Sequence, residues 1–239
     1  MTDHHSAVRL RVAKSILGGI LLMIGAFAQA AEGGPRIPSP SLADKLIRMA
    51  PGADSQVLEL AASALDCADP DAQRLAVIDY SRPSTEPRLW VFDLHAGQLL
   101  FEELVSHGRG SGDAKATRFS NVPESYQSSL GLFRTQNTYH GRNGYSLRLE
   151  GLESGVNDLA YKRAIVVHGA DYVSQDFIAQ TGRLGRSHGC PAVRSDIAAP
   201  LIDSIKDEQY LFVYYPDPEW LAGSQYLNCP REPVQLASR

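Results

Sequence analysis

Two stretches near residue 50 show the polar and apolar spacing of helices. In the second stretch the apolar residues recur every three or four positions and share one helical face: Val57, Leu58, Ala61 and Leu65. Asp54 precedes it as an N-cap, and Ser41 caps a shorter predicted helix over residues 42–50, which Pro51-Gly52 ends. Both helices come before the β-rich part of the chain, so we expect them to pack against it.

After residue 70 the pattern changes to short runs of β-branched and aromatic residues bounded by turn residues, which is typical of strands. Seven runs are predicted strands: residues 74–80, 88–94, 98–105, 128–135, 146–152, 164–168 and 210–215. His95-Ala96-Gly97 joins the second and third in a tight hairpin, and a helix over 197–206 is expected with Ser195 as its cap. Strands and helices do not alternate regularly, which disfavours a doubly wound sheet. We predict a mainly β (α+β) domain with peripheral helices and an N-terminal helical segment.

The first 30 residues have the organisation of a secretory signal peptide. Arg9, Arg11 and Lys14 give a positive start, residues 16–27 are apolar, and an A-x-A sequence ends at Ala30. The apolar run is too short for an ordinary membrane-spanning helix, although an uncleaved anchor is the alternative. We expect cleavage near Ala30 and a mature protein in the periplasm or otherwise outside the cytoplasm. Membrane contact is then expected only through the signal peptide before cleavage.

Composition excludes little except nucleic-acid binding. The 239 residues are 44% hydrophobic and 21% charged, as in an ordinary globular protein, and the net charge is −4 at pH 7. A nucleic-acid partner would require a basic surface, and the sequence has no basic run. We therefore expect no nucleic-acid partner.

The three cysteines are an odd number for a protein outside the cytoplasm, where disulfides form. This count favours one bridge and one free thiol. We predict that Cys67 pairs with Cys229 and ties an early helix to the C-terminal tail, so that Cys190 stays free. The alternative is that Cys67 and Cys229 both stay unpaired.

Candidate chemistry lies in two stretches that a protein fold can bring together. Residues 165–169 read as a buried strand ending in His168 and Gly169, and residues 185–193 form a glycine-rich loop that contains Cys190. A nearby imidazole lowers the pKa of a thiol and moves its proton. This arrangement predicts a thiol nucleophile, Cys190, with His168 as its base. A buried structural cysteine is the alternative interpretation.

The glycines of the second stretch let backbone N–H groups converge on a small volume. We expect the loop residues Ser187, His188 and Gly189 to surround such an oxyanion site, which stabilises the negative charge that develops in acyl transfer. Ser187 is also expected to form hydrogen bonds within the loop.

Two other motifs overlap this loop. Residues 185–189 match the G-x-S-x-G elbow of serine hydrolases, but that fold places its histidine well after the serine. His188, the neighbour of Ser187, is the last histidine of the chain, which excludes such a triad. A zinc site from His168, His188, Cys190 and Asp171 would match none of the usual ligand spacings. We expect neither a metal nor a cofactor.

One sequence pattern resembles the signature of YkuD-type L,D-transpeptidases of bacterial cell walls: His168, about eighteen further residues, and then Ser187-His188-Gly189-Cys190. Val167-His168-Gly169 resembles the family's Ile-His-Gly, and residues 129–133 stand where the family has Thr-Pro-x-Gly-x-Phe. Longer runs resemble a divergent branch, the murein L,D-transpeptidase catalytic domain family: residues 107–112, 118–121, 144–148 and 187–193. The resemblance spans about residues 75–215. It implies the family's β-sandwich-like catalytic domain.

The resemblance implies an acyltransferase of cell-wall biogenesis that acts on peptidoglycan stem peptides as donor and acceptor. Cys190 would attack the carbonyl at the L-centre of diaminopimelate, and His168 would protonate the departing amine. The carbonyl of Gly169 would fix the histidine tautomer. The thioester would pass to the amine of a second stem peptide, which makes a cross-link.

The chain departs from the main family after the nucleophile. That family continues Cys-x-Arg or Cys-x-Asn, whereas Pro191 and Ala192 follow Cys190 here. The group that orients the donor is therefore expected to differ. Three arginines are candidates for binding the substrate carboxylates, with solvated surface charge as the alternative for each: Arg183, Arg186 and Arg194.

We expect four segments: a signal peptide over residues 1–30, a linker with helices over 31–70, a catalytic domain over 71–218 and a C-terminal tail over 219–239. Two other functions remain open from the sequence. The same thiol would serve an L,D-carboxypeptidase or endopeptidase if water accepted the acyl group. A non-catalytic wall-binding module would not need Cys190.

Overall fold

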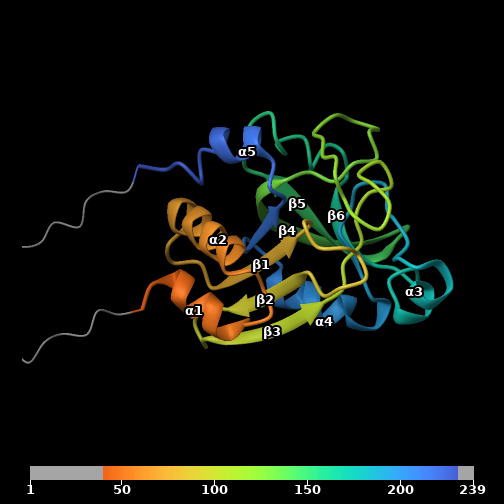
Figure 1. Ribbon diagram of the computed structural model, residues 1–239, viewed down its shortest axis with the longest axis horizontal. Coiled ribbons are helices and arrows are strands. Elements are labelled where there is room, and N and C mark those ends of the chain that lie inside the picture. Colours follow the sequence, from red (N-terminus) through yellow and green to blue (C-terminus); the bar gives the residue numbers. More distant parts are fainter. Residues whose placement is uncertain (1–39, 231–239) are drawn as a thin grey trace, which may run out of the picture. The chain divides into compact units, whose positions relative to one another are not determined.

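One mixed sheet of eight strands forms the centre of the computed structural model, which describes residues 40–230 (Figure 1). The strands are ordered β3-β2-β1-β8-β4-β5-β6-β7. Their bounds are Arg74–Asp79 (β1), Leu89–Asp93 (β2), Gln98–Glu103 (β3), Gly131–Gly141 (β4), Gly144–Gly151 (β5), Val166–Gly169 (β6), Ala192–Val193 (β7) and Tyr210–Tyr214 (β8). The pairs β1–β8 and β6–β7 are parallel, and the other neighbours are antiparallel.

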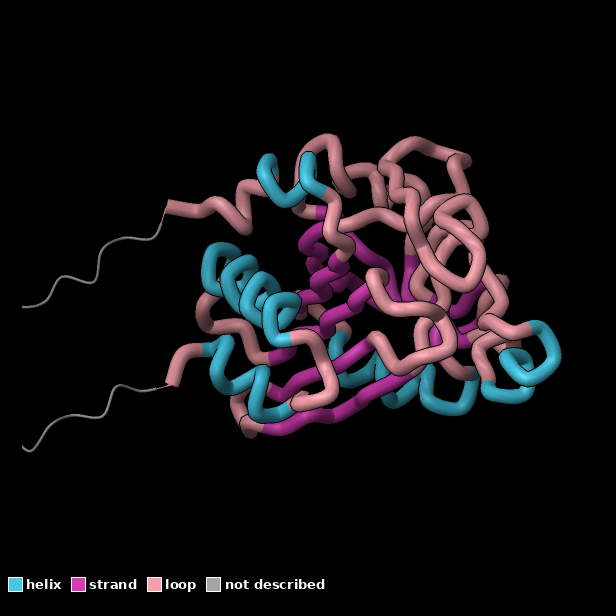
Figure 2. Tube along the Cα trace, in the orientation of Figure 1, coloured by secondary structure: helices cyan, strands magenta, loops and turns pink. Residues whose placement is uncertain are grey.

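Different parts of this sheet are covered by helices and by loops. The helices are α1 (Leu42–Met49), α2 (Ser55–Ala68), α3 (Gln175–Thr181), α4 (Ser195–Ile205) and α5 (Pro218–Gly223). Helices α1 and α2 lie at the end of the sheet that holds β1–β3, whereas loops cover the end near β6 (Figure 2). Within residues 40–230, no helix is long and apolar enough to cross a membrane. The described residues belong to one compact unit, Ser39–Arg239.

The buried face of α2 explains why the N-terminal helices dock on the sheet. Its predicted apolar residues are all buried, and α2 packs against β1 and β8. Asp54 caps α2 through the amides of Gln56 and Val57, and Ser41 forms a capping box with Asp44 at the start of α1. Complete burial of a leucine such as Leu58 contributes about 2 kcal/mol. Helix α4 packs on β6, β5 and β1, so β1 is buried along its whole apolar length.

The fold class predicted from the sequence is confirmed, and every predicted strand is present with shifted ends. The run expected over residues 128–135 begins later, at Gly131, because Ser128 and Ser129 make loop contacts instead. The two-residue strand β7 and the short helices α3 and α5 were not predicted. The predicted signal peptide lies outside the described residues.

The expected capping role of Ser195 is wrong. Helix α4 begins at Ser195 itself, and Arg194 stands at the N-cap position without a side-chain capping bond. The Ser195 hydroxyl instead donates to Asp171 Oδ1 at 2.7 Å. A carboxylate supplied by a distant part of the chain therefore competes successfully for the hydroxyl that local sequence assigns to the cap.

Cys67 and Cys229 form the predicted disulfide. Cys67 lies in the last turn of α2, Cys229 follows α5, and their Cα atoms are 6.1 Å apart across a sequence separation of 162 residues. Cys190 is the free thiol. The bridge joins the N-terminal helical segment to the end of the described chain, so it constrains nearly the whole domain in the unfolded state.

We predict that the double variant Cys67→Ser/Cys229→Ser folds but is less stable by about 5 kcal/mol, because the loop that the bridge closes is long. Urea unfolding followed by circular dichroism measures the difference. A reductant should lower the wild-type midpoint to that of the variant and leave the variant unchanged. Equal midpoints for the oxidised wild type and the variant would contradict this role of the bridge.

Candidate active site

His168 is held inside the sheet near its β6 end. It is the third residue of β6 and lies opposite Ser146 of β5 and Ala192 of β7. Its side chain is buried, and Nδ1 lies 2.8 Å from the carbonyl oxygen of Gly169. Because a carbonyl can only accept, Nδ1 carries the proton and Nε2 is left as the basic nitrogen. Burial lowers the pKa of His168, and the Gly169 hydrogen bond opposes that effect.

Cys190 lies two residues before β7, so the parallel β6–β7 pair brings the thiol to the histidine. His168 and Cys190 line the same cavity, which has a volume of about 330 Å³. The sulfur lies 3.7 Å from the carbonyl oxygen of Ala164. Burial raises the pKa of the Cys190 thiol, while the Val166 N–H and the Arg163 guanidinium lower it. At neutral pH the resting site therefore holds a neutral thiol and a neutral imidazole.

Ser187 fixes the shape of the loop that carries the thiol. Its hydroxyl donates to the Cys190 carbonyl at 2.6 Å and accepts from the Gly189 amide at 3.1 Å. The predicted hydrogen bonding of Ser187 within the loop is therefore present, and its one hydroxyl proton is donated there. The Gly189 N–H is engaged by this contact. Within residues 40–230, the amides of His188 and Cys190 donate to no other residue, which leaves these two as the candidate oxyanion donors.

A second segment that contains a glycine, residues 107–109, packs against this loop. Main-chain hydrogen bonds join Ser187 to His107 and Arg109 on both sides of Gly108. Gly108 approaches so closely that an added Cβ would stand 2.8 Å from the Gly189 Cα, and Gly189 itself has a φ of 125°. Only glycine fits both positions, because one requires close backbone contact and the other a conformation that L side chains avoid.

Residues 107–109 are in turn held in place by a buried cation, the guanidinium of Arg88. Arg88 is completely buried, and its guanidinium contacts the Val105 carbonyl and His107 Nδ1, the latter at 2.9 Å. Burial first, and the adjacent Arg88 charge second, lower the pKa of His107 to about 3. The neutral ring can then accept from the guanidinium, as the geometry requires. Sequence reasoning missed Arg88, since an isolated arginine in a predicted strand carries no motif.

Of the three candidate arginines, Arg186 alone lines the cavity of Cys190. Its Nη1 also contacts the Gly112 carbonyl and, at 3.1 Å, Asp113. Arg183 pairs with the same carboxylate at 2.9 Å and is outside the cavity lining. Arg142, from the two-residue turn between β4 and β5, also lines the cavity. Sequence reasoning missed it, because only the fold brings this hairpin tip to the thiol.

Tyr172 is another cavity residue that the sequence did not reveal. Its carbonyl accepts from the Gly185 amide at 2.9 Å, which joins the segment after β6 to the loop before Cys190. Burial raises the pKa of Tyr172 to about 12, so the phenol keeps its proton at neutral pH. His188, by contrast, is exposed, and its ring packs against Tyr126 at a centroid distance of 4.8 Å.

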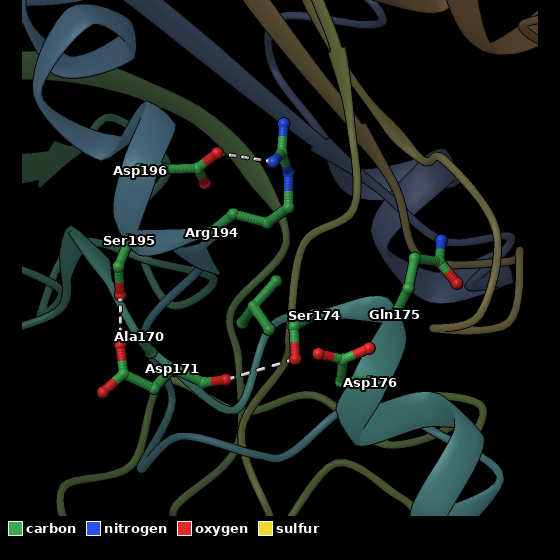
Figure 3. A pocket seen from close by; sticks show the side chains of 9 residues that line it. Ala170, Asp171, Ser174, Gln175, Asp176, Arg194, Ser195 and Asp196 are labelled. Carbon is green, nitrogen blue, oxygen red and sulfur yellow. Dashed lines mark hydrogen bonds and ion pairs between the residues drawn. The ribbon is translucent and has the colours of Figure 1, made fainter.

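Arg194 lies at a separate hollow of about 400 Å³ beyond β6 and β7 (Figure 3). It forms a two-pronged ion pair with Glu103. It also contacts Asp196 at 2.7 Å, while Ser195 donates to Asp171 (Figure 3). Asp171 and Arg194 are thus committed to contacts outside the cavity of Cys190. In the described part of the chain, no group of three or more His, Cys, Asp and Glu side chains is placed to hold a metal ion.

Comparison with solved structures gives only distant similarities. An L,D-transpeptidase from Mycobacterium smegmatis is 16% identical with a TM-score of 0.38, and the match covers 60% of this chain and 59% of that one. L,D-transpeptidase 3 from Mycobacterium tuberculosis is 12% identical with a TM-score of 0.39, over 60% and 62% of the two chains. The helical cell shape determining protein Pgp2 from Campylobacter jejuni is 11% identical with a TM-score of 0.40, over 62% and 49%. The chain thus matches about half to three fifths of the length of these proteins.

No curated protein matches the sequence. The family described as L,D-transpeptidase catalytic domain matches residues 49–214, which are more than half of the chain and contain both His168 and Cys190. The chain therefore belongs to the L,D-transpeptidase catalytic domain family.

Proposed function

We propose that the protein is a peptidoglycan L,D-transpeptidase in which Cys190 forms a thioester with a donor stem peptide. The observation that carries this proposal is the shared cavity of Cys190 and His168, with the Gly169 carbonyl holding His168 in the tautomer that leaves Nε2 basic. Membership of the L,D-transpeptidase family supports the same chemistry. Both roles were expected from the sequence.

The reaction needs only groups that the chain and its substrates supply. His168 takes the thiol proton while the sulfur attacks the donor carbonyl, and a tetrahedral intermediate forms. The amide bond then breaks, the proton passes to the departing amine of the D-amino acid, and a thioester remains. The amine of a second stem peptide attacks the thioester, His168 receives its proton, and the thiol is regenerated as the new amide forms.

The burial of the pair determines when the proton moves. Burial raises the pKa of Cys190 and lowers that of His168, so both effects oppose a thiolate–imidazolium ion pair before the reaction begins. The thiolate is then formed mainly as the bond to the carbonyl forms. The amide N–H groups of His188 and Cys190 donate hydrogen bonds to the carbonyl oxygen of the donor as it becomes negatively charged.

Arg142 and Arg186 are the cavity cations that we assign to the substrate carboxylates. Arg186 is restrained by Gly112 and Asp113, whereas no described carboxylate forms an ion pair with Arg142. A guanidinium binds a carboxylate through two parallel hydrogen bonds, which orients as well as attracts it. Arg142 thereby orients the donor peptide, a role for which Pro191 and Ala192, next to the thiol, have no polar side chain.

The location follows from the same assignment. L,D-transpeptidases act on the cell wall, and the Cys67–Cys229 disulfide suits an oxidising compartment outside the cytoplasm. Export through a signal peptide cleaved near Ala30 remains a prediction from the sequence, as do the four segment boundaries. N-terminal sequencing of the exported protein tests the cleavage site.

We predict that the mature protein converts tetrapeptide muropeptides into cross-linked dimers and that Cys190→Ser abolishes this activity. Chromatography with mass spectrometry measures the products. The variant Cys67→Ser/Cys229→Ser, which keeps only Cys190, is the matched control and should retain activity below its unfolding temperature. Shortened monomers without dimers would instead identify a carboxypeptidase or endopeptidase. Activity that survives Cys190→Ser would contradict the thiol mechanism.

We predict that Arg142→Gln raises the KM for the donor about tenfold, since the loss of one charged hydrogen bond costs about 1.4 kcal/mol. The rate at which iodoacetamide alkylates Cys190 should not change, because Arg142 is assigned to the substrate and not to the thiol. Arg74→Gln is the control, since Arg74 pairs with Asp93 at the far side of the sheet. An unchanged KM would exclude Arg142 from donor binding.

A further inference from the structure

Arg163 connects the last residues before β6 to a distant loop. Its guanidinium donates to the carbonyls of Ser120 and Gln127, at 2.7 and 2.8 Å, and to the hydroxyls of Ser129 and Ser125, at 2.6 and 3.2 Å. One half-buried side chain thus gathers four acceptors from the segment of residues 120–129. No motif pointed to this arginine in the sequence.

The segment that Arg163 gathers is in direct contact with the loop of the thiol. The Gln127 carbonyl oxygen stands 2.9 Å from where a Cβ on Gly189 would lie. Ser128 donates to the Gly189 carbonyl at 3.1 Å and accepts from the Gly108 amide at 3.0 Å. Any loosening of residues 120–129 therefore reaches the residue next to Cys190.

The residue after Arg163 touches the sulfur itself. Ala164 has a φ of 56°, a left-handed conformation that costs a non-glycine residue free energy, and its carbonyl oxygen lies 3.7 Å from Cys190 Sγ. A conformation of this kind persists where the surroundings hold it. The four hydrogen bonds of Arg163 supply that restraint on one side of Ala164, and β6 supplies it on the other.

The charge of Arg163 is not neutralised by a carboxylate. It forms no ion pair with an acidic residue among residues 40–230, and its Nε is buried without an acceptor. Burial lowers the pKa of Arg163, and the negative form of Cys190 raises it again. Conversely, burial raises the pKa of the thiol, and the Val166 N–H and, after it, the Arg163 guanidinium lower that pKa. The nearby charge that this cation favours is therefore the thiolate.

The other polar groups around the sulfur do not replace this cation. Tyr80 and Tyr172 interact electrostatically with Cys190, but burial raises the pKa of each to about 12, so both are neutral. His168 is neutral at rest, and its pKa is lowered by burial. The other charged or titratable side chains that line the cavity are Arg142, Arg186 and the exposed His188.

We propose that Arg163 is a positioning residue that seats the loop of Cys190 through residues 120–129 and stabilises the thiolate by its uncompensated positive charge. The proposal rests on the proposed function in taking Cys190 as the nucleophile. It adds that the cation that stabilises the thiolate is the residue before Ala164 and does not come from the positions after the thiol, where Pro191 and Ala192 stand and Arg194 is held by Glu103.

The test is the pH dependence of Cys190 alkylation by iodoacetamide, followed by intact mass from pH 6 to 10.5. Cys190 is the one free thiol of three, so the reaction reports on it alone. Arg163→Gln should raise the midpoint by about one pH unit and slow alkylation at pH 7 about tenfold, because only the thiolate reacts. Arg163→Lys keeps the charge and should shift the midpoint by less than half as much.

Thermal unfolding separates this effect from a loss of structure. Both variants lose hydrogen bonds to residues 120–129, so their Tm should fall similarly while their midpoints differ. Arg134→Gln is the matched control, because Arg134 pairs with Glu150 and Glu208, and should leave the alkylation profile unchanged. An unaltered midpoint in Arg163→Gln, or equal shifts in the Gln and Lys variants, would overturn the proposal. The assay uses no muropeptide, so its outcome is independent of whether the protein is a transpeptidase.

Discussion

The parallel pairing of β6 with β7 is the constraint on which the candidate site depends. It sets His168 opposite Ala192, two residues after Cys190, and thereby brings the imidazole and the thiol to one cavity. Strand β7 has only two residues, so its own hydrogen bonds to β6 are too few to hold the two strands together. Main-chain bonds from Ser106 to Ala192 and from Ala170 to Val193 extend it, at 2.8 and 2.9 Å. The site is therefore built from several short contacts between loops and not from one long strand.

The burial of these loops affects the chemistry of the site as well as its structure. The same exclusion of water that keeps the thiol and imidazole neutral also strengthens each fixed dipole and charge around them. The loop with the two candidate oxyanion amides, the Gly169 carbonyl and the Arg163 guanidinium are all held by contacts made before a substrate arrives. A site of this kind reorganises little during reaction, which is the usual physical basis of electrostatic catalysis.

The parts of the structure that depend on local pattern could be predicted from the sequence. The period of α2, its Asp54 cap and the strands follow from neighbouring residues. Cys190 and His168 were predicted from a glycine-rich loop and a strand end, and the family resemblance supported the pair. Arg142, Arg163 and Tyr172 could not be found in this way, because each reaches the site through folding of a separate loop. Ser195 shows the converse case, in which the distant Asp171 overrides a local capping preference. The short element β7 exists only because β6 is present to pair with it.

The disulfide has a consequence for the order in which the protein must mature. Cys190 stands between Cys67 and Cys229 in the chain, so during synthesis it emerges before the partner of Cys67 does. Three cysteines allow three single bridges, and a Cys67–Cys190 bridge, which would block the proposed nucleophile, can form before the Cys67–Cys229 bridge. Closing the loops over Cys190 hides its thiol and slows exchange with oxidants. Folding of the sheet before oxidation therefore favours the native bridge and keeps Cys190 free.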